Sequence, residues 1–186
     1  SARFRRCSAV GRESAESAIR TRGGDRISSG TYDVIFGKQP VTDLFANIVI
    51  PALSLSSINT SDTPFLGKLG QKISSELLTV YDDGTIKGAI GSKKISCEGI
   101  PTGRTDLIHS GFLVGFLANN YLSKKWNNKI ASFVPRNGFR FEKGGRNPAI
   151  QPRICPTNIV IEGKEEVSVQ SLLSKINDGI YIGRIW

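Results

Sequence analysis

Short runs of alternating apolar and β-branched residues predict most of the ordered structure. Strands are expected at residues 31–36, 77–81, 105–108, 112–117, 157–161 and 180–186, where valine, isoleucine, threonine and aromatic residues are concentrated. Apolar positions recur at helical spacing in residues 12–21, 40–49, 119–125 and 169–176, and these stretches predict helices. Because strands and helices are mixed along the chain, we expect an α+β fold with a mostly antiparallel sheet and a few flanking helices.

Polar segments between these runs predict turns, a loop and a helix cap. Residues 82–84 (Asp-Asp-Gly) favour a turn, since aspartate bonds nearby amides and glycine tolerates a positive φ. Residues 109–111 (His-Ser-Gly) are expected at a hairpin tip, and the small polar residues of 54–63 predict a loop. Ser168 is the expected N-cap of the helix that follows it.

Length and composition indicate one large domain, or one and a half small ones, and no integral membrane protein. The chain of 186 residues is long enough to bury a core. Its most apolar stretch, residues 44–55, is interrupted by Asn47 and Pro51, so it does not predict a membrane span. Residues 1–6 are basic without an apolar run behind them, which argues against a secretory signal. The odd number of cysteines, three, favours a reducing compartment, and we expect a cytoplasmic protein.

The net charge of +9 is concentrated in two segments. Residues 1–26 carry seven arginines, and residues 124–153 carry eight basic side chains with Glu142 as their only acid. The second group is Lys124, Lys125, Lys129, Arg136, Arg140, Lys143, Arg146 and Arg153. Aromatic residues are interleaved with it, so this segment is a candidate site for nucleic acid or an acidic partner. The alternative interpretation is a solvated, glycine-rich loop whose charges serve solubility.

Residues with catalytic or metal-binding chemistry are scarce. His109 is the only histidine, so no histidine pair one helical turn apart can form a zinc site. Cys7, Cys97 and Cys155 lack any Cys-x-x-Cys spacing, and we interpret them as small buried side chains. Serine hydrolases need a Gly-x-Ser-x-Gly elbow, which the sequence does not contain.

The neighbouring carboxylates Asp82 and Asp83 are a further candidate for chemistry. They would serve as an acid–base pair only if both side chains faced one reacting group. Adjacent residues of a strand or turn point apart, so the turn interpretation is favoured for both.

An ordered set of short motifs resembles the C-terminal domain of the TldD/PmbA family, once called modulators of DNA gyrase and related to peptide-maturing metalloproteases. The motifs are Gly-Arg-Glu-x-Ala at 11–15, Ser-Gly-x-Tyr-x-Val at 29–34, Phe-x-Gly-x-x-Gly-Gln at 65–71, Val-Tyr-Asp-Asp-Gly-Thr at 80–85, Glu-Gly-Ile-Pro-Thr at 98–102, Pro-Arg at 152–153, Thr-Asn at 157–158 and Gly-Ile-Tyr at 179–181. The resemblance implies a basic N-terminal segment with a short helix at 1–28. It also implies a domain at 29–186 that is built on a curved antiparallel sheet and is truncated at its C-terminus.

The resemblance also implies which branch of the family the chain is similar to. Catalytic members carry His-Glu-x-x-x-His on a helix ahead of the Phe-x-Gly-x-x-Gly-Gln segment. The corresponding residues here, 45–57, contain neither histidine nor glutamate. The chain therefore resembles the metal-free, PmbA-like branch, and we expect no metal and no other cofactor.

The function that this resemblance implies is a non-catalytic subunit of a peptide-processing assembly. Family members form homodimers or pairs of a metal-binding and a metal-free subunit, so we expect such a partner and no membrane. An exposed strand edge would hold an extended peptide by strand addition. The alternative function is a basic module that contacts nucleic acid or an acidic partner through residues 124–153.

Overall fold

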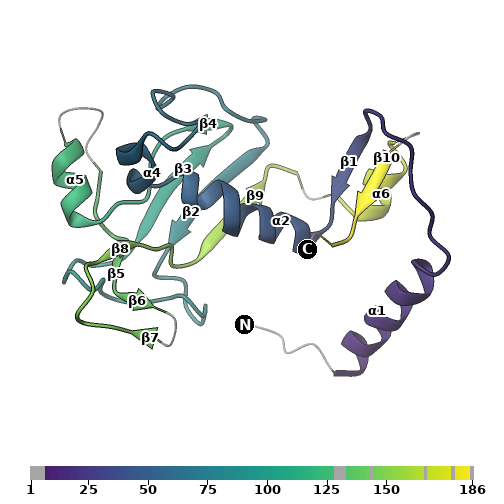
Figure 1. Cartoon of the computed structure of the whole chain (residues 1–186), viewed down its shortest axis with the longest axis horizontal. Coiled ribbons are helices and arrows are strands. Elements are labelled where there is room, and N and C mark those ends of the chain that lie inside the picture. The colour runs from purple at the N-terminus through teal and green to yellow at the C-terminus, as the bar shows by residue number, and fades with distance from the viewer. Residues whose placement is uncertain (1–6, 128–132, 143–144, 166, 177–178, 185–186) are drawn as a thin grey trace.

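A four-stranded antiparallel sheet is the centre of the molecule (Figure 1). The computed structural model describes residues 7–127, 133–142, 145–165, 167–176 and 179–184. The strand order is β4-β3-β2-β9, formed by β2 (Leu78–Asp83), β3 (Arg104–His109), β4 (Phe112–Leu113) and β9 (Ile159–Gly163). β2 pairs with β3 on one side and with β9 on the other, so a strand from near the C-terminus completes the sheet.

One face of this sheet is buried beneath short helices. These are α3 (Ile50–Ala52), α4 (Leu55–Thr60) and α5 (Asn120–Trp126). The core includes Val80 and Leu107 from the strands, Leu53 and Leu55 from the helical segment, and Leu117 ahead of α5, each at most 1% exposed. Burying one such side chain contributes roughly 1.5–3 kcal/mol, so this layer fixes which face of the sheet remains open to solvent.

A two-residue turn and a side-chain hydrogen bond shape the hairpin between β3 and β4. Ser110 and Gly111 connect the strands with φ angles of 45° and 83°, the positive values that a two-residue hairpin turn requires. Ser110 N–H donates to Thr79 Oγ1 of the neighbouring β2 at 3.2 Å. The hairpin and its tip are therefore confirmed, although β4 covers only the first two residues of the expected strand 112–117.

Three smaller strand pairs lie outside the central sheet. β5 (Gly138–Phe139) pairs with β8 (Arg153–Ile154), and β6 (Phe141–Glu142) pairs with β7 (Gly145–Arg146), both antiparallel. β1 (Asp33–Phe36) and β10 (Gly179–Ile182) are parallel and join the two ends of the domain. The α+β fold with mostly antiparallel strands is confirmed, with β1–β10 as the exception.

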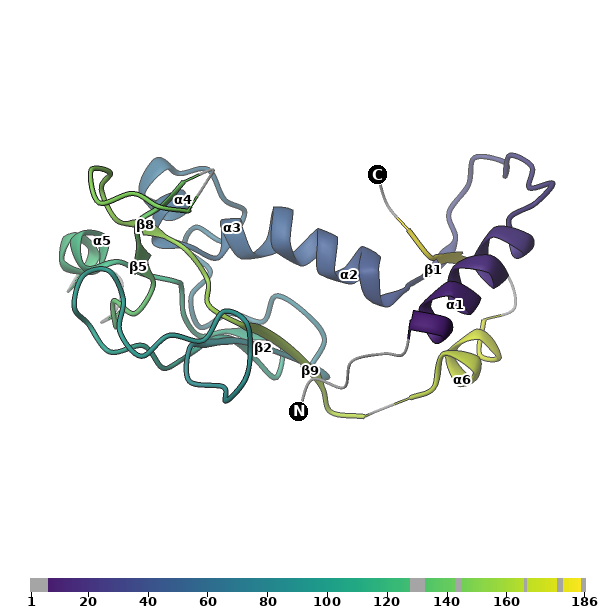
Figure 2. The same ribbon diagram turned by 90° about the horizontal axis from the view of Figure 1, so that it is seen from below.

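A continuous helical rod connects the β1–β10 pair to the central sheet (Figure 2). It runs through α2 (Lys38–Leu44), the π-helical segment η1 (Phe45–Val49) and α3. Helices α1 (Cys7–Arg20) and α6 (Val169–Leu173) lie near β1 and β10 in both views (Figures 1 and 2). Within the described residues, no helix is long and apolar enough to cross a membrane.

The expected loop at 54–63 is wrong, because much of it forms α4. Ser54 caps this helix by accepting a hydrogen bond from Ser57 N–H at 3.4 Å, and Ser61 ends it with a φ of 59°. Leu55 and Ile58, three residues apart, bury one face of the helix. The polar composition of the segment reflects its exposed face and its caps.

Candidate binding face of the central sheet

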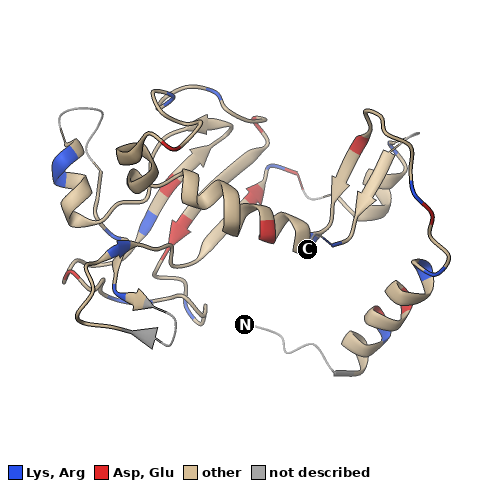
Figure 3. Cartoon of the chain, viewed as in Figure 1, with Lys and Arg blue, Asp and Glu red and all other residues tan. Residues whose placement is uncertain are grey.

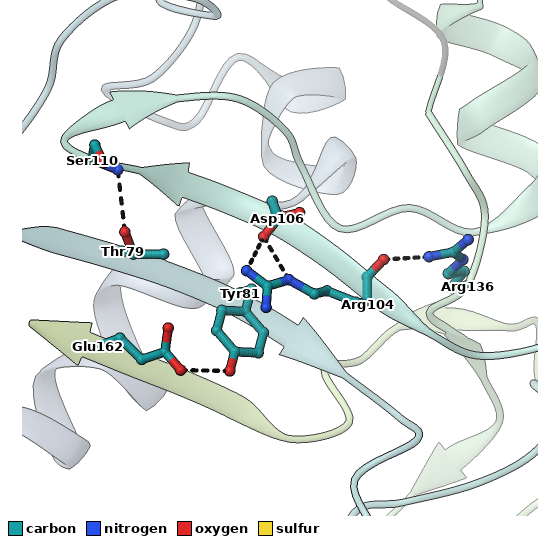
Figure 4. Close-up of polar contacts among 7 residues, drawn as sticks. All are labelled: Thr79, Tyr81, Arg104, Asp106, Ser110, Arg136 and Glu162. Carbon is teal, nitrogen blue, oxygen red and sulfur yellow. Dashed lines mark hydrogen bonds and ion pairs between the residues drawn. The ribbon is translucent and has the colours of Figure 1, made fainter. Parts of the chain in front are cut away.

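The open face of the sheet carries a cluster of paired polar side chains (Figure 4). Arg104 and Asp106 are two residues apart on β3 and so point to the same side. Tyr81 is opposite Asp106 in the strand register, and Glu162 of β9 is diagonal to Tyr81. Neighbouring strands therefore place these four side chains within reach of one another.

Arg104 is held in place by a carboxylate and an aromatic ring. Its Nε and Nη2 atoms lie 2.9 and 2.8 Å from Asp106 Oδ1. The guanidinium carbon is 3.7 Å from the centre of the Tyr81 ring, a cation–π contact. The hydrogen bond to Asp106 is the main reason that the pKa of Arg104 is raised. Since both members of the ion pair are almost half exposed, the pair alone adds little stability, and the stacking on Tyr81 also holds the Arg104 side chain.

Tyr81 is positioned by a hydrogen bond to the next strand. Its hydroxyl donates to Glu162 Oε1 at 2.8 Å. This bond is the first cause of a raised pKa for the phenol, with desolvation second. The hydroxyl group of Tyr81 thus remains protonated at neutral pH, and the ring is held between Arg104 and Glu162 (Figure 4).

A pocket of about 210 Å³ opens beside this cluster. Its lining comprises Arg104, Thr105, Asp106, Val114, Gly115, Phe116, Phe133, Val134 and Arg136. Arg136 reaches across from the segment before β5, and its guanidinium donates to the carbonyl oxygen of Arg104 (Figure 4). The arrangement combines basic, polar and apolar groups, as ligand-binding pockets commonly do.

Asp82 lies in β2 and is buried, so the expected turn role is wrong for this residue. Its carboxylate accepts three hydrogen bonds: from Asn137 Nδ2 at 2.6 Å, from Thr157 N–H at 2.6 Å and from the Thr157 hydroxyl at 3.0 Å. Burial raises the pKa of the Asp82 carboxyl, and the bond from Asn137 is the largest opposing influence. Asp83 does take the turn role, because its Oδ1 accepts from the Thr85 amide at 2.8 Å. The two carboxylates point to different partners and do not form an acid–base pair.

The structure spreads the basic residues of the 124–153 segment over several elements (Figure 3). Lys124 and Lys125 are exposed on α5, and Arg153 is exposed on β8. Arg140 donates to Pro148 O at 2.6 Å, and Arg136 belongs to the pocket described above. Lys129 and Lys143 lie outside the described residues, as does the side chain of Arg146. Polyanion binding by this set stays a prediction.

The residues present do not fit the metal site of the catalytic branch. Residues 45–57 supply no imidazole, thiolate or carboxylate, and the hydroxyls of Ser54 and Ser57 both donate to Pro51 O at 2.9 and 2.8 Å. His109 is exposed at the end of β3, and the side chains of Cys97 and Cys155 are only partly buried, not fully buried as expected. The described part of the chain contains no group of three or more metal-binding side chains.

Comparison with known proteins identifies the family. The family model of the PmbA/TldA metallopeptidase C-terminal domain matches residues 29–186. The chain belongs to the PmbA/TldD family. Among curated PmbA/TldD relatives, a metalloprotease of Methanocaldococcus jannaschii is 31% identical over 170 residues, which cover 91% of this chain and 35% of the relative. The chain spans about a third of the length of the curated relatives it matches.

Solved PmbA/TldD structures share the fold. A Thermotoga maritima protein described as a candidate modulator of a DNA gyrase superposes with a TM-score of 0.80 at 26% identity, covering 98% of this chain and 39% of that one. TldE from Thermococcus kodakarensis gives a TM-score of 0.71 at 27% identity, covering 90% of this chain and 37% of that one. The resemblance drawn from the sequence motifs is thus confirmed.

Sequence reasoning did not single out the Tyr81 and Arg104 cluster. The sequence did contain one indication: Arg104 and Asp106 are two residues apart in the region of an expected strand, so their side chains were expected on the same face. What the sequence did not show is the strand register, which places Tyr81 and Glu162 beside them.

Proposed function

We propose that this chain is part of a metal-free, PmbA-like subunit that binds unfolded peptide within a peptide-processing assembly. Membership of the family supports the link to peptide processing, because several relatives are named metalloproteases. The metal-free assignment depends on residues 45–57, which contain no histidine, cysteine, aspartate or glutamate. This subunit then contributes a peptide-binding surface to the assembly and no catalytic side chain.

The edge strand β9 is the proposed place for an extended peptide. It is the last strand in the order β4-β3-β2-β9, and Ile161 on it is 38% exposed. An edge strand presents backbone donors and acceptors that pair with an added strand whatever the sequence of that strand. Such binding needs no catalytic side chain.

Incubating the purified chain with Zn²⁺ and an unstructured peptide tests the metal-free assignment. We expect the peptide to stay intact, as followed by mass spectrometry, and to be cleaved only when a family member with His-Glu-x-x-x-His is added. Hydrolysis by this chain alone would contradict the proposal.

Substitution at the strand edge tests the binding mode. Ile161→Lys places a charge on β9 and should weaken peptide binding measured by fluorescence anisotropy, because edge lysines oppose strand addition. Ile90→Lys is the matched control, since Ile90 is fully exposed on a loop outside the sheet. Equal affinities for the two variants, both folded by circular dichroism, would exclude β9 as the binding edge.

A second candidate function is binding of nucleic acid through the basic segment. It is favoured by exposed Lys124, Lys125 and Arg153 and by the gyrase-related description of the Thermotoga relative. Neutralising phosphates releases counterions, so affinity for duplex DNA should fall steeply as salt is raised. A DNA affinity that does not change with salt would exclude this function.

Assembly and location complete the proposal. The subunit pairs with a second copy or with a metal-binding family member, and it works in the cytoplasm. Its mass in solution, alone and mixed with a histidine-bearing relative, tests the pairing, and a fluorescent fusion tests the location.

A further inference from the structure

The pocket beside β3 lies away from the proposed peptide edge. β3 and β9 are separated by β2 in the sheet order, so a ligand in this pocket would not contact β9 through the strand edge. The pocket of about 210 Å³ is smaller than the roughly 300–1,000 Å³ of sites for larger organic ligands. Its size suits one amino-acid residue at the end of a chain.

Of the two arginines that line the pocket, Arg136 has no carboxylate partner in the described part of the chain. The guanidinium of Arg104 is already occupied by Asp106. Within the described residues, the Arg136 guanidinium donates to the carbonyl oxygen of Arg104 and forms no ion pair. Arg136 therefore offers its charge and further N–H groups to a ligand (Figure 4).

Thr105 adds a hydroxyl without a partner. Its Oγ1 atom is buried, and within the described residues it makes no hydrogen bond. Such a group usually costs about 1–3 kcal/mol when left unsatisfied, so an acceptor that reached this hydroxyl would gain a hydrogen bond. Thr105 and Arg136 line the same pocket, so one acceptor group is the simplest partner for both.

The remaining walls are apolar and partly open. Phe116 and Phe133 are buried and meet edge to face with 6.0 Å between ring centres. Val114 and Val134 are 45% and 51% exposed, so their side chains are free to cover an alkyl group. A ligand for this pocket thus carries a negative acceptor and an adjacent apolar part.

We propose that this pocket binds the C-terminal carboxylate of a peptide whose last side chain is apolar. The carboxylate accepts hydrogen bonds from the Arg136 guanidinium and the Thr105 hydroxyl, and the apolar side chain packs on Val114 and Val134. The inference rests on the proposed function in taking peptide as the ligand, but it assigns a separate site and a requirement for a free end.

The test compares acetyl-Ala-Ala-Leu with its C-terminal amide by NMR titration of the full chain. We expect the acid to bind at least about tenfold more tightly, because a charge-assisted hydrogen bond is worth about that factor. Arg136→Gln and Thr105→Val should each reduce the affinity for the peptide acid to the affinity for the peptide amide. Lys125→Gln, an exposed change in the same basic segment, should keep the preference.

Thr105→Val also distinguishes a loss of binding from a loss of folding. Because the hydroxyl has no partner within the described residues, its replacement by an isosteric methyl should not lower the melting temperature. Equal affinity for acid and amide, no binding of either at millimolar concentration, or a preference unchanged in both variants would overturn the proposal.

A longer unstructured peptide with a blocked C-terminus separates this inference from the proposed function. If that peptide binds and the short acid does not, the pocket assignment fails and strand addition stands. If the short acid binds and the blocked peptide does not, the pocket stands and strand addition fails.

Discussion

At the scale of single residues, a buried carboxylate connects two parts of the fold. Asp82 belongs to the central sheet, while its hydrogen-bond donors Asn137 and Thr157 lie beside the β5–β8 pair. The sequence could not reveal this, because Asp-Asp-Gly has the composition of a turn and the donors are 55 and 75 residues away. Only tertiary packing decides which of two adjacent aspartates is buried.

Asp82→Asn is expected to destabilise the chain by about 1–3 kcal/mol, since an amide NH₂ would face donor groups that now bind a carboxylate. Urea unfolding at neutral pH measures the loss. Asp83→Asn is the matched control, because asparagine can still accept from the Thr85 amide in the turn. Equal destabilisation by both substitutions would contradict the role assigned to Asp82.

Tyr81 gives a prediction for alkaline pH. Its pKa is raised chiefly by the bond to Glu162, so the contribution of that bond to stability is present below the ordinary pKa of 10.0 and is lost as pH rises through the folded-state pKa. Ultraviolet titration should show one of the four tyrosines ionising late. In Glu162→Gln this late step should move toward lower pH. An unchanged titration curve would exclude the bond as the cause.

At the scale of elements, local chemistry specified the turns and caps better than the lengths of the strands. Gly111 and Ser168 occupy the positions expected from their residue types, and Ser168 accepts from the Ser171 amide at 3.1 Å. β4 is short because the amides of Val114 and Gly115 both bond to Leu107 O, which breaks the regular ladder, and Leu117 then pairs with the backbone of Leu53 and Leu55. α4 was missed since its serines cap the helix and face solvent, which from composition alone resembles a loop.

Gly111→Ala tests the hairpin. Alanine would adopt a φ near 83° and bring its Cβ within 2.8 Å of the carbonyl oxygens of Ser74 and Ser75. Gly99→Ala is the matched control, with a φ of 76° and no atom within 4 Å of the added Cβ. The left-handed conformation alone costs about 1–2 kcal/mol, so chemical denaturation should show a larger loss for Gly111→Ala than for Gly99→Ala. Equal losses would mean that the close approach is relieved without cost.

At the scale of the whole molecule, the β1–β10 pair exposes apolar side chains to solvent. Val34 and Phe36 of β1 and Tyr181 of β10 are each more than 40% exposed, as are Val169 and Leu173 of α6. Two strands alone bury too little apolar surface to be stable, so this end of the molecule is suited to contact with another polypeptide. The sequence predicted the strands individually, but their parallel pairing depends on segments about 146 residues apart.

Phe36→Ser is expected to reduce self-association of the chain. Light scattering across a concentration series should show a mass that rises less steeply with concentration than that of the unmodified chain, because apolar contact area has been removed. Ile90→Ser is the control, since Ile90 is exposed in a loop distant in sequence from β1 and β10. If the measured mass of the unmodified chain equals that of a monomer at all concentrations, this surface is excluded as a self-association site.

The π-helical turn in the connecting rod determines which side chains lie on the same side of that helix. Ile50 N–H bonds to Phe45 O, five residues back, and Ala46 and Pro51, also five apart, line the same pocket. In an α-helix, positions with that spacing would be about 140° apart around the axis. Five is also the spacing of the two histidines in His-Glu-x-x-x-His, so two histidines introduced with that spacing in this turn would lie on the same side of the helix. The double variant Ala46→His, Pro51→His should therefore bind Zn²⁺ in calorimetry, whereas neither single variant should. Failure of the double variant to bind Zn²⁺ would show that the π-helical turn does not bring the two imidazoles together.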